Sequence, residues 1–176
     1  MSIDICGYIE FYNSELARNL YNNAGSDIVS SFTNSGKIFF PRDYSLFSII
    51  KDVGHAGLPT APYLSYSVMS EYEKNNNNNN AVNPTWLTLF NMKTVRKKYI
   101  AEKMVFNGVH DSNAWELLAQ LDSEELSSSS SQIHDQNFIF NNCDSAPWYS
   151  SIKLMESLEY FDPNIVSRFV CWFEKR

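Results

Sequence analysis

Polar and hydrophobic residues alternate over the opening stretch of the chain, "SIDICGYIEFYN". Ile3, Ile5, Ile9 and Phe11 fall on one side of an extended backbone, with Asp4, Cys6, Tyr8 and Glu10 on the other. This period of two predicts a strand with one clearly buried face. Gly7, in the middle of the stretch, indicates a bulge or a close backbone approach.

A helical pattern begins after a short apolar stretch, residues 37–40, which Pro41 ends. Asp43 is placed to cap a helix whose apolar residues recur at helical spacing up to residue 53, and Gly54 predicts a left-handed exit. A second helix is expected at about residues 65–74.

The segment "NMKTVRKKYIAEKMVFNG" predicts a longer helix that Gly108 ends, with Met92, Val95, Tyr99 and Phe106 directed inward. "DSNAWELLAQLDSEEL" and "SAPWYSSIKLMESLEYF" predict two more helices.

The last strand, Ile165–Phe173, is apolar on both faces except for Arg168, which predicts a central position in the sheet. "TWLTL" predicts another strand. Strands and helices are interspersed without a regular βαβ repeat. The pattern therefore predicts one α+β domain over residues 1–176, with a mixed sheet and helices mainly on one face.

Two low-complexity runs interrupt this pattern. The chain has 19 Asn and 23 Ser, which concentrate in six consecutive asparagines and five consecutive serines. Asparagine is a poor former of helices and strands, and such a run buries no apolar surface. We expect flexible loops at about 74–83 and 123–136.

Charge and cysteine content narrow the class of protein. A net charge of -6 argues against broad nucleic-acid binding. Three cysteines without a CxxC pair indicate a reducing, intracellular and cytoplasmic setting. The sequence shows no signal-peptide pattern, and no apolar stretch approaches the length that a membrane span needs.

Three segments, "IDICGYIEF", "PRDYSLFSIIKDV" followed by "GLP", and "RFVCWF", carry a resemblance when they are taken in this order. The chain resembles an uncharacterised family of small phage, viral and bacterial proteins. That family's pattern has a first strand IDI-x-G-[FYW]-[IV]-E, then RNY-x-LF, GLP, a W-[IV]-T strand and a last strand rich in Arg, Val, Phe and Trp. "TWLTL" matches the fourth of these segments.

Two departures from the family pattern bear on function. Asp43 stands where the family often has Asn, and Asn83-Pro84-Thr85 stands where it tends to have histidine and serine. Any role of those histidines is therefore expected to be lost here. The resemblance implies an accessory protein of viral or phage type.

Catalytic motifs are sparse. His110-Asp111 and His134-Asp135 are the adjacent His–acid pairs, and a metal-dependent phosphohydrolase needs further ligands around one metal. The sequence has no G-x-S-x-G motif and no Gly-rich phosphate loop. We therefore expect no catalytic residue, metal site or cofactor, and keep a metal-dependent nucleotide or phosphodiester hydrolase as the alternative.

Several cations are candidates for binding an anion. Lys93, Arg96, Lys97 and Lys103 lie on or near one helical face, which forms either a basic patch or a solvated outer face. Arg168 forms either a structural ion pair, with Asp4 or Glu10, or part of a pocket.

The candidate ligand-binding residues are Arg42, Asp43, Tyr44, Trp86, Arg168 and Tyr8. Together they would stack a nucleotide base beside a bound phosphate. The leading functional hypothesis is a binding protein without catalysis, a host-defence antagonist that sequesters a small nucleotide signal or binds a host protein. A homo-oligomeric interaction module, formed through Trp148, Trp172 or the helix faces, is the other alternative.

Overall fold

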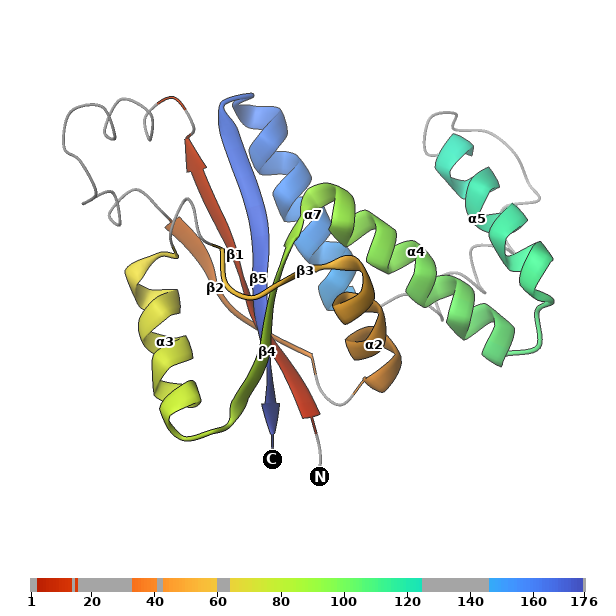
Figure 1. Ribbon diagram of the computed structural model, residues 1–176. Helices are drawn as coiled ribbons and strands as arrows, with labels where there is room; N and C mark the ends of the chain where they lie inside the picture. Colours follow the sequence, from red (N-terminus) through yellow and green to blue (C-terminus); the bar gives the residue numbers. More distant parts are fainter. Residues whose placement is uncertain are drawn as a thin grey trace.

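The computed structural model describes residues 3–13, 15, 33–40, 43–59, 64–124 and 146–175. Its strands form one sheet in the order β2-β1-β5-β4-β3 (Figure 1). They are β1 (Ile3–Asn13), β2 (Thr33–Phe40), β3 (His55–Ala56), β4 (Ala81–Thr88) and β5 (Ile165–Lys175). All pairs in this sheet are antiparallel. The α+β class is confirmed, but a mixed sheet is wrong, because the hydrophobic pattern that identifies strands does not encode their direction.

Helices cover both faces of the sheet unequally. They are α2 (Tyr44–Val53), α3 (Tyr66–Asn77), α4 (Leu89–Phe106), α5 (Asp111–Glu124) and α7 (Ala146–Phe161). Figure 1 shows α2, α4 and α7 on one face and α3 on the other. The α5 helix packs against α4, away from the sheet. The prediction of helices mainly on one face is confirmed.

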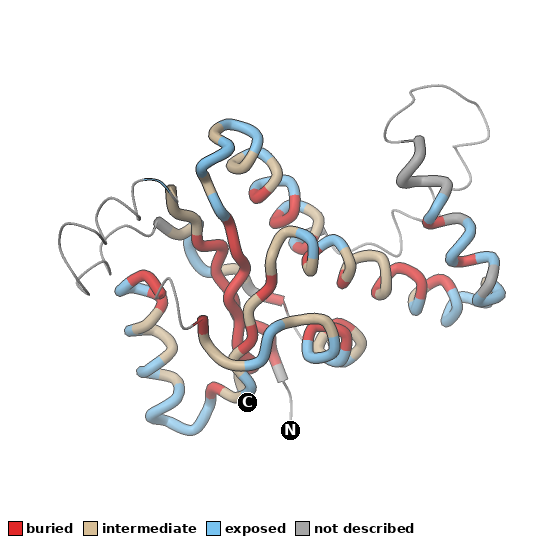
Figure 2. The backbone as a smooth tube through the Cα atoms, turned by 45° about the horizontal axis from the view of Figure 1, so that its top comes forward, coloured by how far each residue is buried: buried red, intermediate tan, exposed pale blue. Residues whose placement is uncertain are grey.

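The central strand β5 contributes side chains to the buried core on both faces of the sheet. Phe169 and Phe173 pack under α2, α4 and α7, whereas Val170 and Trp172 pack under α3. Each of these four side chains has no exposed surface. Figure 2 shows the buried residues running through the middle of the sheet. The central position predicted for Ile165–Phe173 is confirmed.

Two glycines permit close packing. A Cβ atom on Gly7 would lie 2.3 Å from Cζ of Phe169, so the group that approaches Gly7 closely is a side chain and not the backbone that was predicted. Gly54 follows α2 with a φ of -79°, so the predicted left-handed exit is wrong. A Cβ atom on Gly54 would instead lie 2.4 Å from Cγ2 of Thr85, which shows that α2 ends close against β4.

The asparagine run is part of the ordered fold. Helix α3 continues to Asn77, and β4 begins at Ala81. The side-chain amide of Asn75 donates to the carbonyl of Glu71 at 3.0 Å, which supports the last turns of the helix. Extending a helix already packed on a sheet costs little once its first turn exists. The loop predicted at about 74–83 is therefore wrong, except for the turn at 78–80.

The second predicted loop, at about 123–136, falls mostly outside the described residues. Residues 123 and 124 end α5, and the rest of that range is not among the residues described.

Candidate functional site

Three of the predicted ligand residues share the face of the sheet that α3 covers. Tyr8 on β1 and Trp86 on β4 are both in register with Val170 on β5, so the three side chains form a row across the sheet. Arg168 lies two residues from Val170 on the same face. Strand register therefore places Tyr8, Trp86 and Arg168, three of the six predicted ligand residues, on one face of the sheet.

Arg168 is bound to a carboxylate. Its Nε and Nη2 atoms donate to Oε2 of Glu10 at 2.9 and 2.7 Å. The other carboxylate oxygen of Glu10 accepts from the backbone N–H of Ser65 at 2.7 Å, directly before α3. Glu10 is fully buried and the Arg168 side chain is 5% exposed. The structural ion pair weighed for Arg168 is confirmed, with Glu10 as the partner, and the pair anchors the start of α3 on the sheet.

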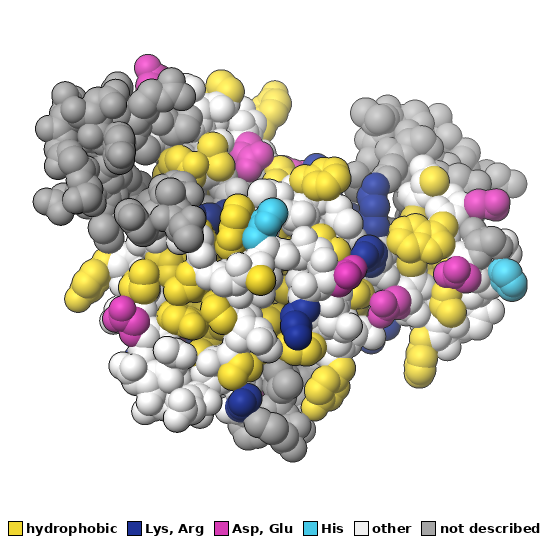
Figure 3. All heavy atoms as spheres, viewed as in Figure 1, with side chains coloured by type: hydrophobic (Ala, Val, Ile, Leu, Met, Phe, Trp, Pro, Cys, Tyr) yellow, Lys and Arg dark blue, Asp and Glu magenta, His cyan; other side chains and the backbone are white. Residues whose placement is uncertain are grey.

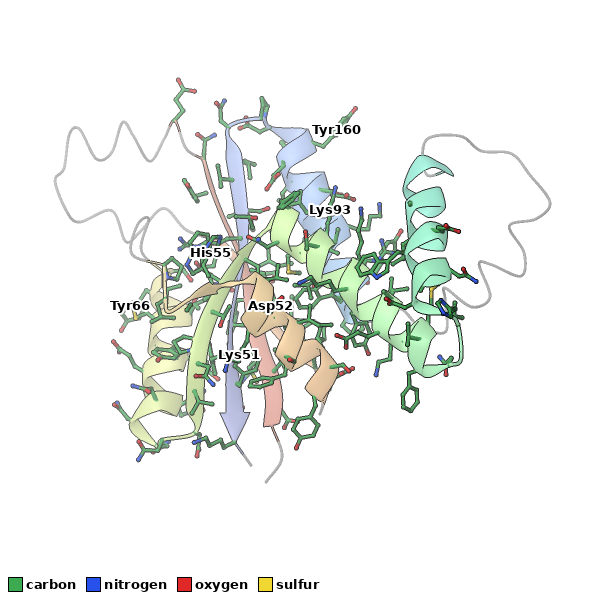
Figure 4. All side chains as sticks on the ribbon, turned by 45° about the vertical axis from the view of Figure 1, so that its right-hand side comes forward. Lys51, Asp52, His55, Tyr66, Lys93 and Tyr160 are labelled. Atoms are coloured by element: carbon green, nitrogen blue, oxygen red, sulfur yellow. The ribbon has the colours of Figure 1, made fainter. Side chains whose placement is uncertain are left out.

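The aromatic residues of this face contact other aromatic rings. Tyr8 is buried and stacks on Trp172, with ring centroids 5.7 Å apart. Trp86 is half-buried and stacks on His55 of the edge strand β3, at 4.2 Å and an interplanar angle of 26°. Figure 4 shows His55 at this edge of the sheet. Both predicted stacking residues are thus engaged inside the fold.

The remaining predicted ligands lie elsewhere. Asp43 caps α2 by accepting from the N–H of Leu46 at 3.0 Å, as predicted, and it also accepts a hydrogen bond from the hydroxyl of Tyr99. Tyr44 is 58% exposed at the start of α2, which packs on the opposite face from Arg168. Arg42 lies outside the described residues. The described members of the predicted pocket therefore do not form one site.

A second group of polar side chains on the α3 face was not predicted. Lys37 on β2 bridges Glu71 of α3, at 3.0 Å, and Glu174 of β5, at 3.3 Å. Burial raises the pKa of the neighbouring Cys6 thiol to about 12, and the hydrogen bond and charge of Glu174 add to the shift. Burial would lower the pKa of Lys37, but the hydrogen bond to Glu71 and the nearby charges raise it overall. Cys6 is thus protonated at neutral pH and a poor nucleophile.

The basic residues of α4 mostly contact neighbouring helices. Lys93, labelled in Figure 4, pairs with Glu156 of α7 at 2.6 Å. The guanidinium of Arg96 lies 4.4 Å from the centroid of the Tyr149 ring. Lys103 lies 5.0 Å from the centroid of Tyr99 and 3.9 Å from the Asp43 carboxylate. Lys93, Arg96 and Lys103 are thus engaged by neighbouring side chains of the packed helices.

His110 and Asp111, the pair that a metal-dependent hydrolase would use among the described residues, are not grouped with further metal ligands there. His110 precedes α5, where its carbonyl accepts from the N–H groups of Asn113 and Ala114. Within the described parts of the chain, no three His, Cys, Asp or Glu side chains are grouped so that they could hold a metal ion. The pair 134–135 lies outside the described residues.

Trp148 and Trp172, considered for a homo-oligomer interface, are 1% and 0% exposed. Their proposed part in an interface is wrong, because both side chains belong to the core.

Exposed apolar side chains also lie on the outer surface of α4 and α5. The first half of α4 packs on the sheet through Met92, Val95 and Tyr99, as predicted, but Phe106 is 88% exposed. The prediction that Phe106 points inward is wrong, because the second half of α4 extends beyond the sheet and packs on α5. Val105 beside it is 42% exposed.

Two hollows lie beside Glu102 and Val105 of α4, and both residues line each of them. One, of about 370 Å³, lies between α4 and α5 and is lined by Glu102, Val105, Asp111 and Trp115, together with Lys98 and Ala101. The other, of about 400 Å³, lies toward the start of α2 and includes Glu102, Val105 and Phe106. Trp115 is 45% exposed. We call Glu102, Val105, Phe106, Asp111 and Trp115 the α4–α5 surface; Figure 3 shows hydrophobic and acidic side chains side by side there.

Sequence patterning gave no local signal for this surface. Two neighbouring residues of a helix can both be buried in one core, as Ile49 and Ile50 of α2 are. The adjacent pair Val105 and Phe106 therefore did not indicate exposure.

No protein-family model, curated protein or solved structure matches this chain. None of the helices in the described residues is long and apolar enough to cross a membrane.

Proposed function

We propose that this protein is a non-catalytic binding protein that captures another protein on the α4–α5 surface. The family resemblance supports an accessory role of viral or phage type, in which the partner would be a host-defence protein held by sequestration. The sequence left two kinds of ligand open, a small nucleotide signal and a host protein. We favour the host protein.

One observation carries the proposal: three large apolar side chains are exposed beside two hollows, with Trp115 at one hollow, Phe106 at the other and Val105 at both. Val105, Phe106 and Trp115 are 42%, 88% and 45% exposed on helices that project beyond the sheet. Fully burying a side chain such as that of Phe106 contributes about 1.5–3 kcal/mol. Contiguous exposed apolar groups mark interaction sites, and tryptophan is enriched among the residues that dominate binding energy.

The Glu10–Arg168 pair weighs against the nucleotide alternative. A phosphate at Arg168 would have to displace a buried carboxylate that also holds the N–H of Ser65. That displacement would leave Glu10 buried without its counter-charge, which is strongly unfavourable.

Selection of random displayed peptides against the wild-type protein tests the proposal. We expect enriched peptides whose binding is lost in Phe106→Ser and in Trp115→Ala, because both variants remove exposed apolar surface. Tyr66→Ser is the matched control, since Tyr66 is 79% exposed on α3, far from this surface (Figure 4).

Peptides that bind all three variants equally would contradict the proposal. A nucleotide that raises the melting temperature, and is recovered intact from the denatured complex, would instead favour the sequestration of a nucleotide.

A further inference from the structure

The hollow between α4 and α5 combines apolar and acidic walls. Lys98, Glu102 and Val105 follow one another at helical spacing along α4, and Asp111 and Trp115 are one turn apart on α5. All five line the same hollow. Its walls therefore offer an indole ring, an aliphatic side chain and two carboxylates to one occupant.

The charges in this hollow are not balanced within the described structure. Nζ of Lys98 lies 2.6 Å from Oδ2 of Asp52, so this cation already has a partner. Glu102 and Asp111 form no ion pair with any residue among those described. Asp111 also lies in the first turn of α5, on the side of the hollow opposite α4. Two negative charges thus remain available beside Trp115.

We infer that the partner presents an arginine next to an apolar side chain, and that this arginine enters the hollow between α4 and α5. The inference rests on the proposed function and specifies the chemistry of the partner. A guanidinium group stacks on an indole face and bonds carboxylates through its planar fork. A lysine ammonium provides the charge without the planar geometry, and the apolar neighbour of the arginine covers Val105.

Peptides selected against the wild-type protein provide the probe. We expect arginine beside an apolar residue to be enriched, and a synthetic selected peptide to bind more tightly than its lysine form. The citrulline form keeps the shape of arginine without the charge, and it should bind most weakly. Glu102→Gln and Asp111→Asn should each weaken the arginine peptide by about two- to fivefold, and by less at high ionic strength. Trp115→Ala should weaken it by about thirtyfold.

Glu116→Gln is the matched control, because it makes the same charge change on α5 at an exposed residue that does not line the hollow. Glu102 is itself exposed and unpaired among the described residues, so Glu102→Gln should fold normally even if Trp115→Ala does not.

The outcomes separate the two proposals. Peptides that require Phe106 and Trp115, but tolerate citrulline and both carboxylate variants, would overturn this inference and leave the proposed function standing. Peptides that are indifferent to every variant of the surface would overturn the proposed function. Self-association that is abolished by Trp115→Ala would identify a second copy as the occupant and would also overturn the inference.

Discussion

Two regions of this molecule combine carboxylates with aromatic rings, and they differ in whether the carboxylates are already paired. Under α3, Glu10 and Arg168 are buried and bonded to each other. On the α4–α5 surface, Glu102 and Asp111 are exposed beside Trp115, and no described residue pairs with them. The same residue types thus build the fold in one region and remain accessible in the other.

Solvation explains the difference. A buried charge loses its hydration and is tolerated only when its partner and its remaining hydrogen bonds are in place. Glu10 meets this condition through Arg168 and Ser65. An exposed carboxylate keeps its water, so Glu102 can stay unpaired at little cost until a partner arrives. The predicted nucleotide pocket drew on Tyr8 and Arg168, which belong to the first kind of region.

The largest effect is expected from breaking the buried pair. Arg168→Met should lower the free energy of unfolding by about 3–5 kcal/mol, because it leaves the Glu10 carboxylate buried without a counter-charge. Urea unfolding monitored by circular dichroism measures this change. Glu102→Gln is the comparison variant from the α4–α5 surface, and it should change the free energy by no more than about 0.5 kcal/mol.

The double variant Glu10→Gln/Arg168→Met sharpens this test. The glutamine keeps an oxygen that can accept from the N–H of Ser65 and carries no charge, so the double variant should be more stable than Arg168→Met alone. Equal losses in Arg168→Met and Glu102→Gln would show that the two regions do not differ as the contacts indicate.

A smaller effect is expected from pH, again on the α3 face. The Cys6 thiol has an ordinary pKa of 9.0, and the fold raises it to about 12. A raised pKa adds stability below pH 9, and this stability is lost as the pH rises toward 12, because the unfolded chain releases the proton first. The free energy of unfolding should fall by about 1 kcal/mol per pH unit in this window through Cys6.

Cys6→Ala isolates this contribution. The pKa of Cys171 is also raised by burial, and that of Lys37 is raised, so both groups act in the same direction in the wild type and in the variant. The difference between the two proteins should therefore follow Cys6, together with the part of the raised pKa of Lys37 and of Cys171 that comes from Cys6, and the variant should show a shallower fall above pH 9. Identical slopes would contradict the assignment of a buried, protonated Cys6.

Sequence patterning predicted those parts of the fold that local periodicity controls. The strand β1, the two apolar faces of β5 and the capping of α2 by Asp43 each depend on neighbouring residues, and each is confirmed. The single buried face predicted for β1 is wrong, because Cys6, Tyr8 and Glu10 on its second face are also buried. Strand direction and the covering of the second face by α3 depend on connections between distant segments. The pattern therefore predicted the elements and the α+β class, but not the antiparallel sheet.

The candidate site was harder to predict for a related reason. A charged residue in an apolar strand has the same sequence signal whether it pairs inside the fold or faces a ligand. Glu10 and Arg168 are 158 residues apart, so only strand register reveals their contact. The exposure of Phe106 follows from where the sheet ends beneath α4, which no local pattern specifies.

The smallest predicted effect concerns the turn that joins α3, the cover of the buried pair, to β4. Asn79 has a φ of 54°, in the left-handed region, and its N–H donates to the carbonyl of Asn76 at 2.9 Å. Asn79→Gly should raise the free energy of unfolding by a few tenths of a kcal/mol, whereas Asn79→Ala should lower it by about 1 kcal/mol, because alanine lacks the side-chain amide that lets asparagine adopt this conformation. Asn78 has a φ of -88°, so Asn78→Ala is a matched control that should be nearly neutral. Urea unfolding of the three variants measures these differences. If Asn79→Ala and Asn78→Ala had equal stability, the turn would be loose in solution, and the asparagine run would be the flexible loop that its composition predicts.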